Sequence, residues 1–166
     1  MSLPCVLSGK SFNFTPFNSK LREYYPNIKQ PTNKFLEWFI GFTEGEGSFI
    51  LAKRGDLSFV ITQSTVDVQI LNYIRDNLGP SFSFLSFPFL IRSSFGMKSF
   101  GKVIMQSKKS NTHRFIIQDL KNLHLICLLF NGNMVFPSRQ ARFLTFFYER
   151  LLRKNLNTIT PLDTRL

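Results

Sequence analysis

The stretch Trp38-Phe39-Ile40-Gly41-Phe42-Thr43-Glu44-Gly45-Glu46-Gly47-Ser48-Phe49 places two carboxylates and three glycines at the end of an apolar run. The run begins near residue 35, with Asn33 or Thr32 available as an N-cap, and its spacing predicts a buried or interface helix. Gly41 and Gly45 lie four residues apart, so they share one helix face. Each glycine costs a helix about 1 kcal/mol relative to alanine. Two glycines in register therefore predict that another backbone approaches this face closely.

Glu44 and Glu46 fall in the last turn of this predicted helix. The helix dipole is negative there and disfavours a carboxylate by about 0.3 to 1 kcal/mol, so a cation is expected nearby. A hard divalent cation such as Mg²⁺ binds carboxylate and carbonyl oxygens and leaves other positions to water and phosphate. The pattern therefore indicates a Mg²⁺ site. The alternative is a pair of exposed acids at a frayed helix end.

Residues 39–47 resemble the motif of the LAGLIDADG homing endonucleases and related intron maturases, with Glu in place of both Asp. The resemblance extends to about Lys154, through Gln63 and the segment 130–139, and includes little before Pro31. It implies an α+β fold with the element order αββαββα. In that fold the antiparallel sheet lies as a saddle on duplex DNA, and the motif helix lies at the dimer interface.

Length and charge agree with this resemblance. The chain has 166 residues, and its 43% hydrophobic content suits one domain with a real core. A net charge of +11 and a pI near 10.1 predict a polyanionic partner, for which nucleic acid is the first candidate. The longest apolar runs are too short for a membrane-spanning helix, so no membrane partner is expected. Cys5 and Cys127 form no zinc pattern, and Cys127 falls on an apolar helix face.

The segments after the motif alternate between strand pairs and helices. We expect a hairpin of strands 48–53 and 57–63, a helix opened by the capping box Ser64-x-x-Asp67 and ended at Gly79, strands 102–107 and 112–117, and helices 120–130 and from Ser138 to about 154. Residues 81–100 could hold a strand and a long loop. The expected organisation is an irregular arm over 1–31, one endonuclease domain over 32–156 and a tail over 157–166.

Basic and amide side chains gather around the two expected hairpins. Lysine and arginine would neutralise phosphates, whereas Gln and Arg can also pair with base edges in the major groove. Arg114 should face outward while Phe115 and Ile117 face the core. A solvated basic face is the alternative. The candidate DNA-binding residues are Lys53, Arg54, Lys98, Lys102, Gln106, Lys108, Lys109 and Arg114.

The resemblance also implies roles for residues of the motif and its surroundings. It places Glu46 and the Gly45 carbonyl at the metal, makes Gln63 and Arg139 the other catalytic candidates, and makes Glu44 a structural acid. Arg139 is the nearest cation to the position where the family usually has a basic residue, and that position is Pro137 here.

Only one motif is present, whereas the family pairs two motif helices, one for each DNA strand. The simplest expectation is a homodimer with Phe39, Gly41, Phe42 and Gly45 at the interface, and the alternative is one half of a two-motif protein. The expected activity is cleavage of a long, roughly palindromic duplex at an intron insertion site. A maturase that binds host intron RNA without cutting DNA is the alternative. Twenty Phe suggest an AT-rich coding sequence, so we expect an organelle-encoded protein, mitochondrial or otherwise.

Overall fold

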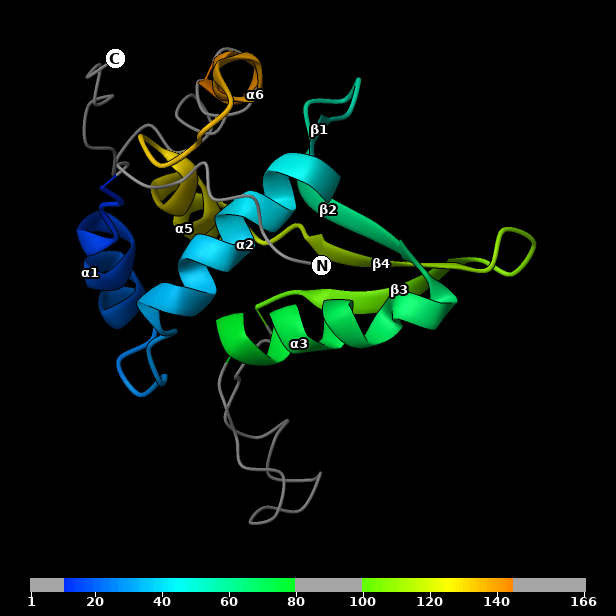
Figure 1. Ribbon diagram of the computed structural model, residues 1–166, viewed down its shortest axis with the longest axis horizontal. Helices are drawn as coiled ribbons and strands as arrows, with labels where there is room; N and C mark the ends of the chain where they lie inside the picture. The colour runs from blue at the N-terminus through cyan, green and yellow to red at the C-terminus, as the bar shows by residue number, and fades with distance from the viewer. Residues whose placement is uncertain (1–10, 80–99, 145–166) are drawn as a thin grey trace.

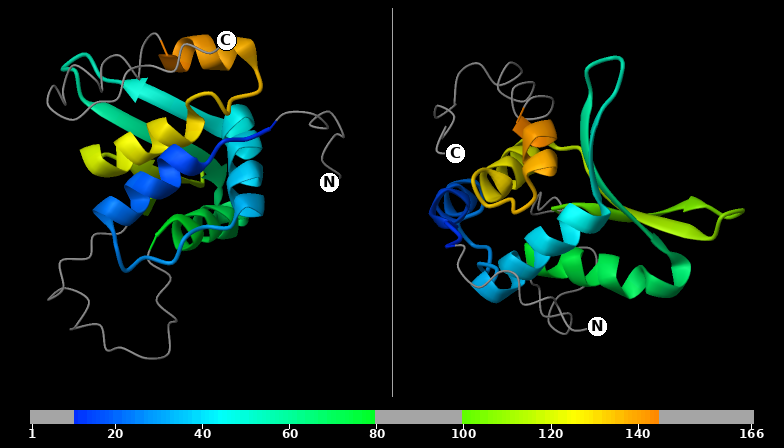
Figure 2. Two further views of the ribbon diagram at one scale, coloured as in Figure 1. Left: turned by 90° about the vertical axis from the view of Figure 1, so that its left-hand side faces the viewer. Right: turned by 45° about the horizontal axis from the view of Figure 1, so that its top comes forward.

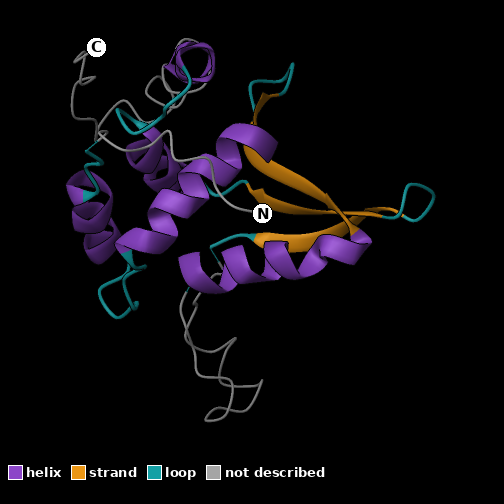
Figure 3. Cartoon of the chain, in the orientation of Figure 1, coloured by secondary structure: helices purple, strands orange, loops and turns teal. Residues whose placement is uncertain are grey.

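The computed structural model describes residues 11–79 and 100–144 of the chain. These residues form an α+β domain in which helices cover one side of a four-stranded antiparallel sheet (Figure 1, Figure 3). The sheet has the strand order β1-β2-β4-β3. The elements are α1 (Thr15–Tyr24), α2 (Asn33–Glu46), β1 (Gly47–Leu51), β2 (Leu57–Ser64), a 3-10 turn (Thr65–Asp67), α3 (Val68–Leu78), β3 (Lys102–Ser107), β4 (Thr112–Ile117), α5 (Leu120–Phe130) and α6 (Pro137–Arg142).

The motif helix α2 forms as its sequence predicts. Thr32 caps it by accepting a hydrogen bond from the Phe35 amide at 3.2 Å. The helix ends at Glu46, and the chain enters β1 at once through Gly47, whose amide donates to the Thr43 carbonyl. A Cβ atom at Gly47 would lie 2.7 Å from that carbonyl oxygen and would also collide with the Thr43 side chain. Glycine is therefore required where the helix turns into the sheet.

The two faces of the sheet differ because successive side chains of a strand point to opposite sides. Phe59 and Ile61 of β2 and Phe115 and Ile117 of β4 point toward the helices and are buried. Phenylalanine rings dominate this core, and Phe59, Phe39 and Phe130 are in mutual ring contact. The other face of the sheet, which we call the open face, carries no helix among the described residues, and the sheet curves around it (Figure 2).

The N-terminal arm is not irregular as expected, because α1 is a helix that packs against α5. Phe17 and Leu21 of α1 are fully buried. The hydroxyl of Tyr24 lies 2.9 Å from Nδ1 of His124, and burial lowers the pKa of that histidine. Residues of the expected arm therefore belong to the core of the domain, and the expectation of an irregular segment was wrong for its described part, residues 11–31.

Most other boundaries agree with the expected ones, and two local details differ. The helix expected to be capped by Ser138 begins instead at Pro137, after Phe136, which makes no side-chain cap. Ser64 accepts from the Val66 amide, but the Asp67 side chain makes no cap bond, so the expected capping box is only half formed. Most of the strand and loop expected in 81–100, and the end of the last helix, fall outside the described residues.

Two further expectations concern the interior and the membrane. Cys127 is a free, fully buried thiol, and burial raises its pKa well above the usual range. It is the small core residue that the sequence predicted. Among the helices within 11–79 and 100–144, none combines the length and the apolar character that crossing a bilayer requires.

Candidate active site and nucleic-acid interface

The carboxylate of Glu46 stands at the point where the motif helix meets the sheet. Glu46 is the last residue of α2 and is exposed. The register that pairs Gly47 with Ile61 brings Gln63, near the end of β2, beside it. Nε2 of Gln63 donates to Oε2 of Glu46 at 3.3 Å. Two of the three candidate catalytic residues are thus in direct contact, which favours one orientation of the carboxylate.

Arg139 reaches the same place from α6. Its Nη1 donates to the carbonyl oxygen of Gly47, the residue after Glu46, across a long distance of 3.4 Å. Arg139 is otherwise exposed. The guanidinium therefore lies next to the carboxylate end of the motif helix, although the two residues are far apart in the sequence.

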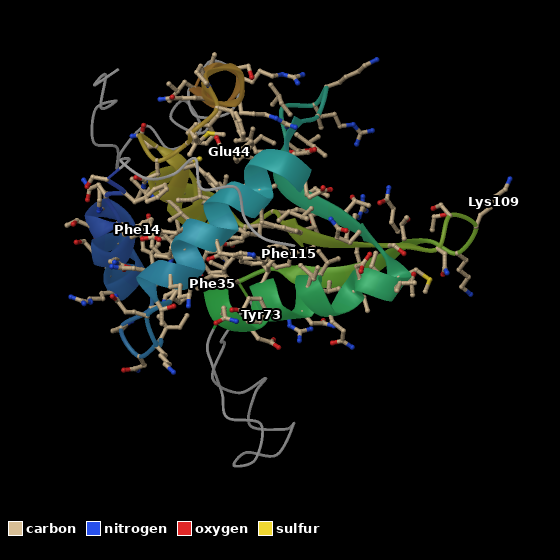
Figure 4. The ribbon with its side chains drawn as sticks, in the orientation of Figure 1. Phe14, Phe35, Glu44, Tyr73, Lys109 and Phe115 are labelled. Carbon is tan, nitrogen blue, oxygen red and sulfur yellow. The ribbon has the colours of Figure 1, made fainter. Side chains whose placement is uncertain are left out.

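Glu44 makes a different contact from Glu46, because its side chain points into the protein. It is 3% exposed, and its Oε1 accepts from the backbone amides of Val135 and Phe136 at 2.7 and 2.8 Å. These amides directly precede α6 (Figure 4 labels Glu44 beside this segment). Oε2 of Glu44 is buried with no hydrogen-bond partner in the part of the chain that the structure describes. Glu44 thus ties the motif helix to the segment that presents Arg139.

The oxygen atoms at the end of α2 suit a hard divalent cation. Glu46 offers an exposed carboxylate, and the carbonyl of Gly45 lies in the last helical turn, where carbonyls lack the usual intrahelical amide partner. Mg²⁺ accepts such ligands and keeps several positions for water and phosphate oxygens. Within residues 11–79 and 100–144 no group of three or more His, Cys, Asp or Glu gathers to hold a metal. The ligands present therefore fit a cation that completes its coordination with water, substrate or a second copy of the site.

Within residues 11–79 and 100–144, nothing packs against the glycine face of α2. Gly41 and Gly45 are exposed, and a Cβ atom built at either meets nothing within 4 Å. The rings of Trp38 and Phe42 stack beside them with centroids 5.1 Å apart and remain partly exposed. Phe39 is fully buried inside the domain, so its expected place at an interface was wrong: it faces the sheet.

The open face of the sheet carries several of the expected DNA-binding residues. The register pairs Arg114 with Thr62 and Lys102 with Ile116, so both basic residues lie on this face. Gln106 joins them across an irregularity in β3, because its Oε1 accepts from the Thr62 hydroxyl at 3.4 Å. As expected, Arg114 lies on the face opposite Phe115 and Ile117.

The remaining basic candidates lie at the two hairpin turns. Lys53 and Arg54 are exposed between β1 and β2, and Lys108 and Lys109 are exposed between β3 and β4. Lys109 projects from the tip of its turn (Figure 4). Lys98 lies outside the described residues. The basic side chains therefore flank the open face at the ends of both hairpins.

The short polar side chains of the open face were not among the binding residues expected from the sequence. Ser48, Ser58, Thr62 and Thr112 occupy this face by the observed register. The signal was available, because they alternate with the apolar residues that face the core. Serine and threonine carry no charge, so they do not contribute to the basic clusters that indicate a nucleic-acid surface in a sequence.

The model of the LAGLIDADG endonuclease family matches residues 39–149 of this chain. The chain belongs to this family. The match begins inside α2 and therefore includes the motif, the sheet and α6. The LAGLIDADG motif is the segment that carries Glu44 and Glu46, so the contacts described above surround the family's own signature.

Two fungal proteins are similar to parts of this chain. A probable intron-encoded endonuclease 4 of Neurospora crassa is 39% identical over 109 residues, which are 66% of this chain and 16% of that protein. A probable intron-encoded endonuclease Cox1-I1b of Schizosaccharomyces pombe is 31% identical over 81 residues, 44% of this chain and 21% of that protein. The chain thus spans less than a quarter of the length of either relative.

The fold is similar to that of proteins whose structures have been solved. The LAGLIDADG meganuclease I-AabMI, solved bound to uncleaved DNA, has a TM-score of 0.54 and 22% identity, and the match covers 73% of this chain and 37% of that one. This likeness shows that the chain has the α+β fold of that structure.

Proposed function

We propose that this LAGLIDADG chain is a homing-type endonuclease that hydrolyses phosphodiester bonds in duplex DNA with a divalent cation, Mg²⁺. One observation carries the proposal: the exposed carboxylate of Glu46, contacted by Gln63, stands at the end of the motif helix where it enters a sheet with an open basic face. A carboxylate in that position can bind a cation against a phosphate that lies on the face.

Each residue would have a different role in cleavage, according to its position. Glu46 and the Gly45 carbonyl would hold the cation, and Gln63 would keep the carboxylate oriented toward it. Arg139, fixed beside Gly47, would place a positive charge near the scissile phosphate. A bound divalent cation would polarise that phosphate and lower the pKa of an attacking water. The buried Glu44 would act only by holding the segment that precedes α6.

The partner proposed for the open face is duplex DNA. The solved relative I-AabMI is bound to DNA. In this chain the basic residues of both hairpin turns and Lys102 and Arg114 could follow the phosphates and bases of one half-site. The printed names of both fungal relatives describe intron-encoded proteins. We therefore propose the intron insertion site as the target and an organellar genome as the source.

Lys108→Ala combined with Lys109→Ala should weaken binding to every duplex by a similar factor. The two exposed lysines lie at a turn and would contact phosphates, so the slope of log affinity against log salt should fall by about 1 for each lost contact. Anisotropy titrations across a salt series measure that slope. The matched control is Lys29→Ala with Lys121→Ala, exposed lysines outside the sheet. An unchanged slope in the turn variant would move the DNA surface elsewhere.

We propose that two such chains pair through the glycine face of α2, so that two Glu46 residues meet near the two strands. Gly41→Leu should then abolish pairing without unfolding the chain, because no described residue lies within 4 Å of the new Cβ and replacing a helical glycine gains up to about 1 kcal/mol. Light scattering and thermal melting measure the two effects. A dimeric Gly41→Leu variant would exclude this face as the interface, and a monomeric wild type would favour the half-protein alternative.

The test of the proposed function is cleavage of a plasmid that carries the host gene without its intron. With Mg²⁺ the chain should cut near the exon junction, and chelation of the metal should stop cutting while leaving the complex with DNA intact. Absence of any cut at the junction, by a chain that binds it, would argue against nuclease activity.

A further inference from the structure

An apolar band crosses the open face of the sheet. Val60 of β2 pairs directly with Ile116 of β4. Ile50 of β1 lies diagonal to Val60, because its neighbour Ser48 is the residue that pairs with Val60. Ile104 of β3 lies diagonal to Ile116 in the same way, through Lys102. Diagonal neighbours of this kind are about 7 to 8 Å apart. Ile50, Val60, Ile116 and Ile104 thus form a continuous line across all four strands.

The band is not part of the hydrophobic core. Along β2 and β4 its members alternate with buried residues that face the helices, and along β1 and β3 they alternate with Phe49 and Val103, which are only partly buried. None of the described helices covers this side (Figure 2). Ile50 is 43% exposed and Ile104 38% exposed, whereas Ile116 is partly exposed and Val60 only 6%. Single exposed apolar residues are common on proteins, whereas exposed apolar residues that gather on one face mark a candidate contact surface. Ile50 and Ile104 at the two ends, and the partly exposed Ile116 between them, are the parts available for contact.

The surroundings of the band favour a polyanion as its partner. Lys102 and Arg114 lie on the same face, each beside a member of the band. The strand positions of this face in β1 to β4 contain no Asp or Glu, and the exposed lysines of the β3–β4 turn extend it. A protein or lipid partner would not require this charge, whereas DNA presents phosphates at the rim of a groove and bases within it.

Within the major groove, one base offers an apolar group to such a band. Thymine carries a C5 methyl there, and the other groups on the base edges are hydrogen-bond donors and acceptors. We propose that Ile50, Ile104 and Ile116 are specificity residues that contact thymine methyl groups, so that this chain selects half-sites with thymines at the positions facing the band. The inference rests on the proposed function, because it assumes that duplex DNA lies on the open face.

The experiment compares thymine with uracil, which differ only by the methyl group. The full-length chain is used to select duplexes from a random-sequence library, without added Mg²⁺ so that they stay intact. The selected duplexes are then made with uracil in place of thymine, one position at a time. Loss of a contacted methyl should weaken binding about fourfold, the effect expected for exposing one methyl-sized group. Positions outside the band should show no difference.

Variants assign each methyl to its side chain. Ile104→Ser and Ile50→Ser should each remove the thymine preference at one set of positions, whereas Ile104→Val should keep it. Val66→Ser is the matched control, because Val66 is 83% exposed in the 3-10 turn, away from the band, and should change nothing. Thermal melting checks that each variant is folded, and the uracil comparison itself needs no variant.

The outcomes separate this inference from the proposed function. Selected duplexes that bind tightly with a uracil penalty confined to a few positions, absent in the serine variants, support the band as a reader of thymine. Tight sequence-specific binding that is identical for thymine and uracil at every position overturns it while leaving the proposed function intact. Failure to enrich any duplex overturns both.

Discussion

Glu46→Gln is expected to lose metal-dependent DNA cleavage and to retain DNA binding. Glutamine keeps the shape of the side chain and can still accept the bond from Gln63, which now reaches Glu46 at 3.3 Å. It lacks the charge that holds a divalent cation. Removing a partner of a metal ligand costs about 10- to 100-fold, so removing the ligand itself should cost at least about 100-fold.

The loss should not reflect damage to the fold. The carboxylate opposes the helix dipole, so the Glu46→Gln variant should melt at or slightly above the wild-type temperature. Single-turnover cleavage of a bound duplex and anisotropy titrations measure the two activities. Glu37→Gln is the control, because Glu37 is exposed on the same helix but lies in its N-terminal half, away from the site. Cleavage by Glu46→Gln at the wild-type rate would mean that this carboxylate does not bind the catalytic metal.

Glu44→Ala is expected to destabilise the fold, whereas substitution of Glu46, the other acid of the motif, is not. The buried Oε1 of Glu44 accepts from two backbone amides at 2.7 and 2.8 Å, and alanine leaves both donors unsatisfied. An unsatisfied buried donor costs about 1 to 3 kcal/mol. Because the segment of Val135 and Phe136 is only partly buried, the free energy of unfolding should fall by roughly 1 to 3 kcal/mol in total. Urea unfolding at fixed protein concentration measures the change.

Two comparisons isolate the contact. Glu44→Gln keeps one acceptor oxygen for the Val135 and Phe136 amides, so it should lose clearly less stability than Glu44→Ala. Glu37→Ala, at an exposed position of the same helix, should change stability by less than about 0.5 kcal/mol. Equal losses for the alanine and glutamine variants would show that charge, rather than the two amide bonds, makes Glu44 important.

Periodic patterns allowed much of the fold to be predicted. The strands 102–107 and 112–117 coincide with β3 and β4, and the helix 120–130 coincides with α5, which Asp119 caps through Oδ2 accepting from the Asn122 amide. These signals are local: alternation defines a strand, and a side-chain cap defines a helix start. The order αββαββα follows from them without knowledge of long-range contacts.

The features that the sequence did not predict depend on contacts between residues far apart in the chain. The helix α1 is held by contacts such as that between Tyr24 and His124, which are 100 residues apart, so no local pattern reveals its partner. Phe39 lies in a helix that is apolar on more than one side, and periodicity alone cannot say which side meets the sheet. The contact between Arg139 and the Gly47 carbonyl likewise depends on how Glu44 holds the segment before α6.

The most direct test of the central claim runs a cleavage assay and a splicing assay in parallel, with wild type and Glu46→Gln. The substrates are the exon-junction duplex that lacks the intron, supplied with Mg²⁺, and the precursor RNA that contains the host intron. We expect wild type to cut the duplex at the junction and Glu46→Gln to bind it without cutting. If wild type never cuts the duplex but accelerates splicing, and Glu46→Gln does so equally well, the chain is a maturase and the endonuclease account is wrong.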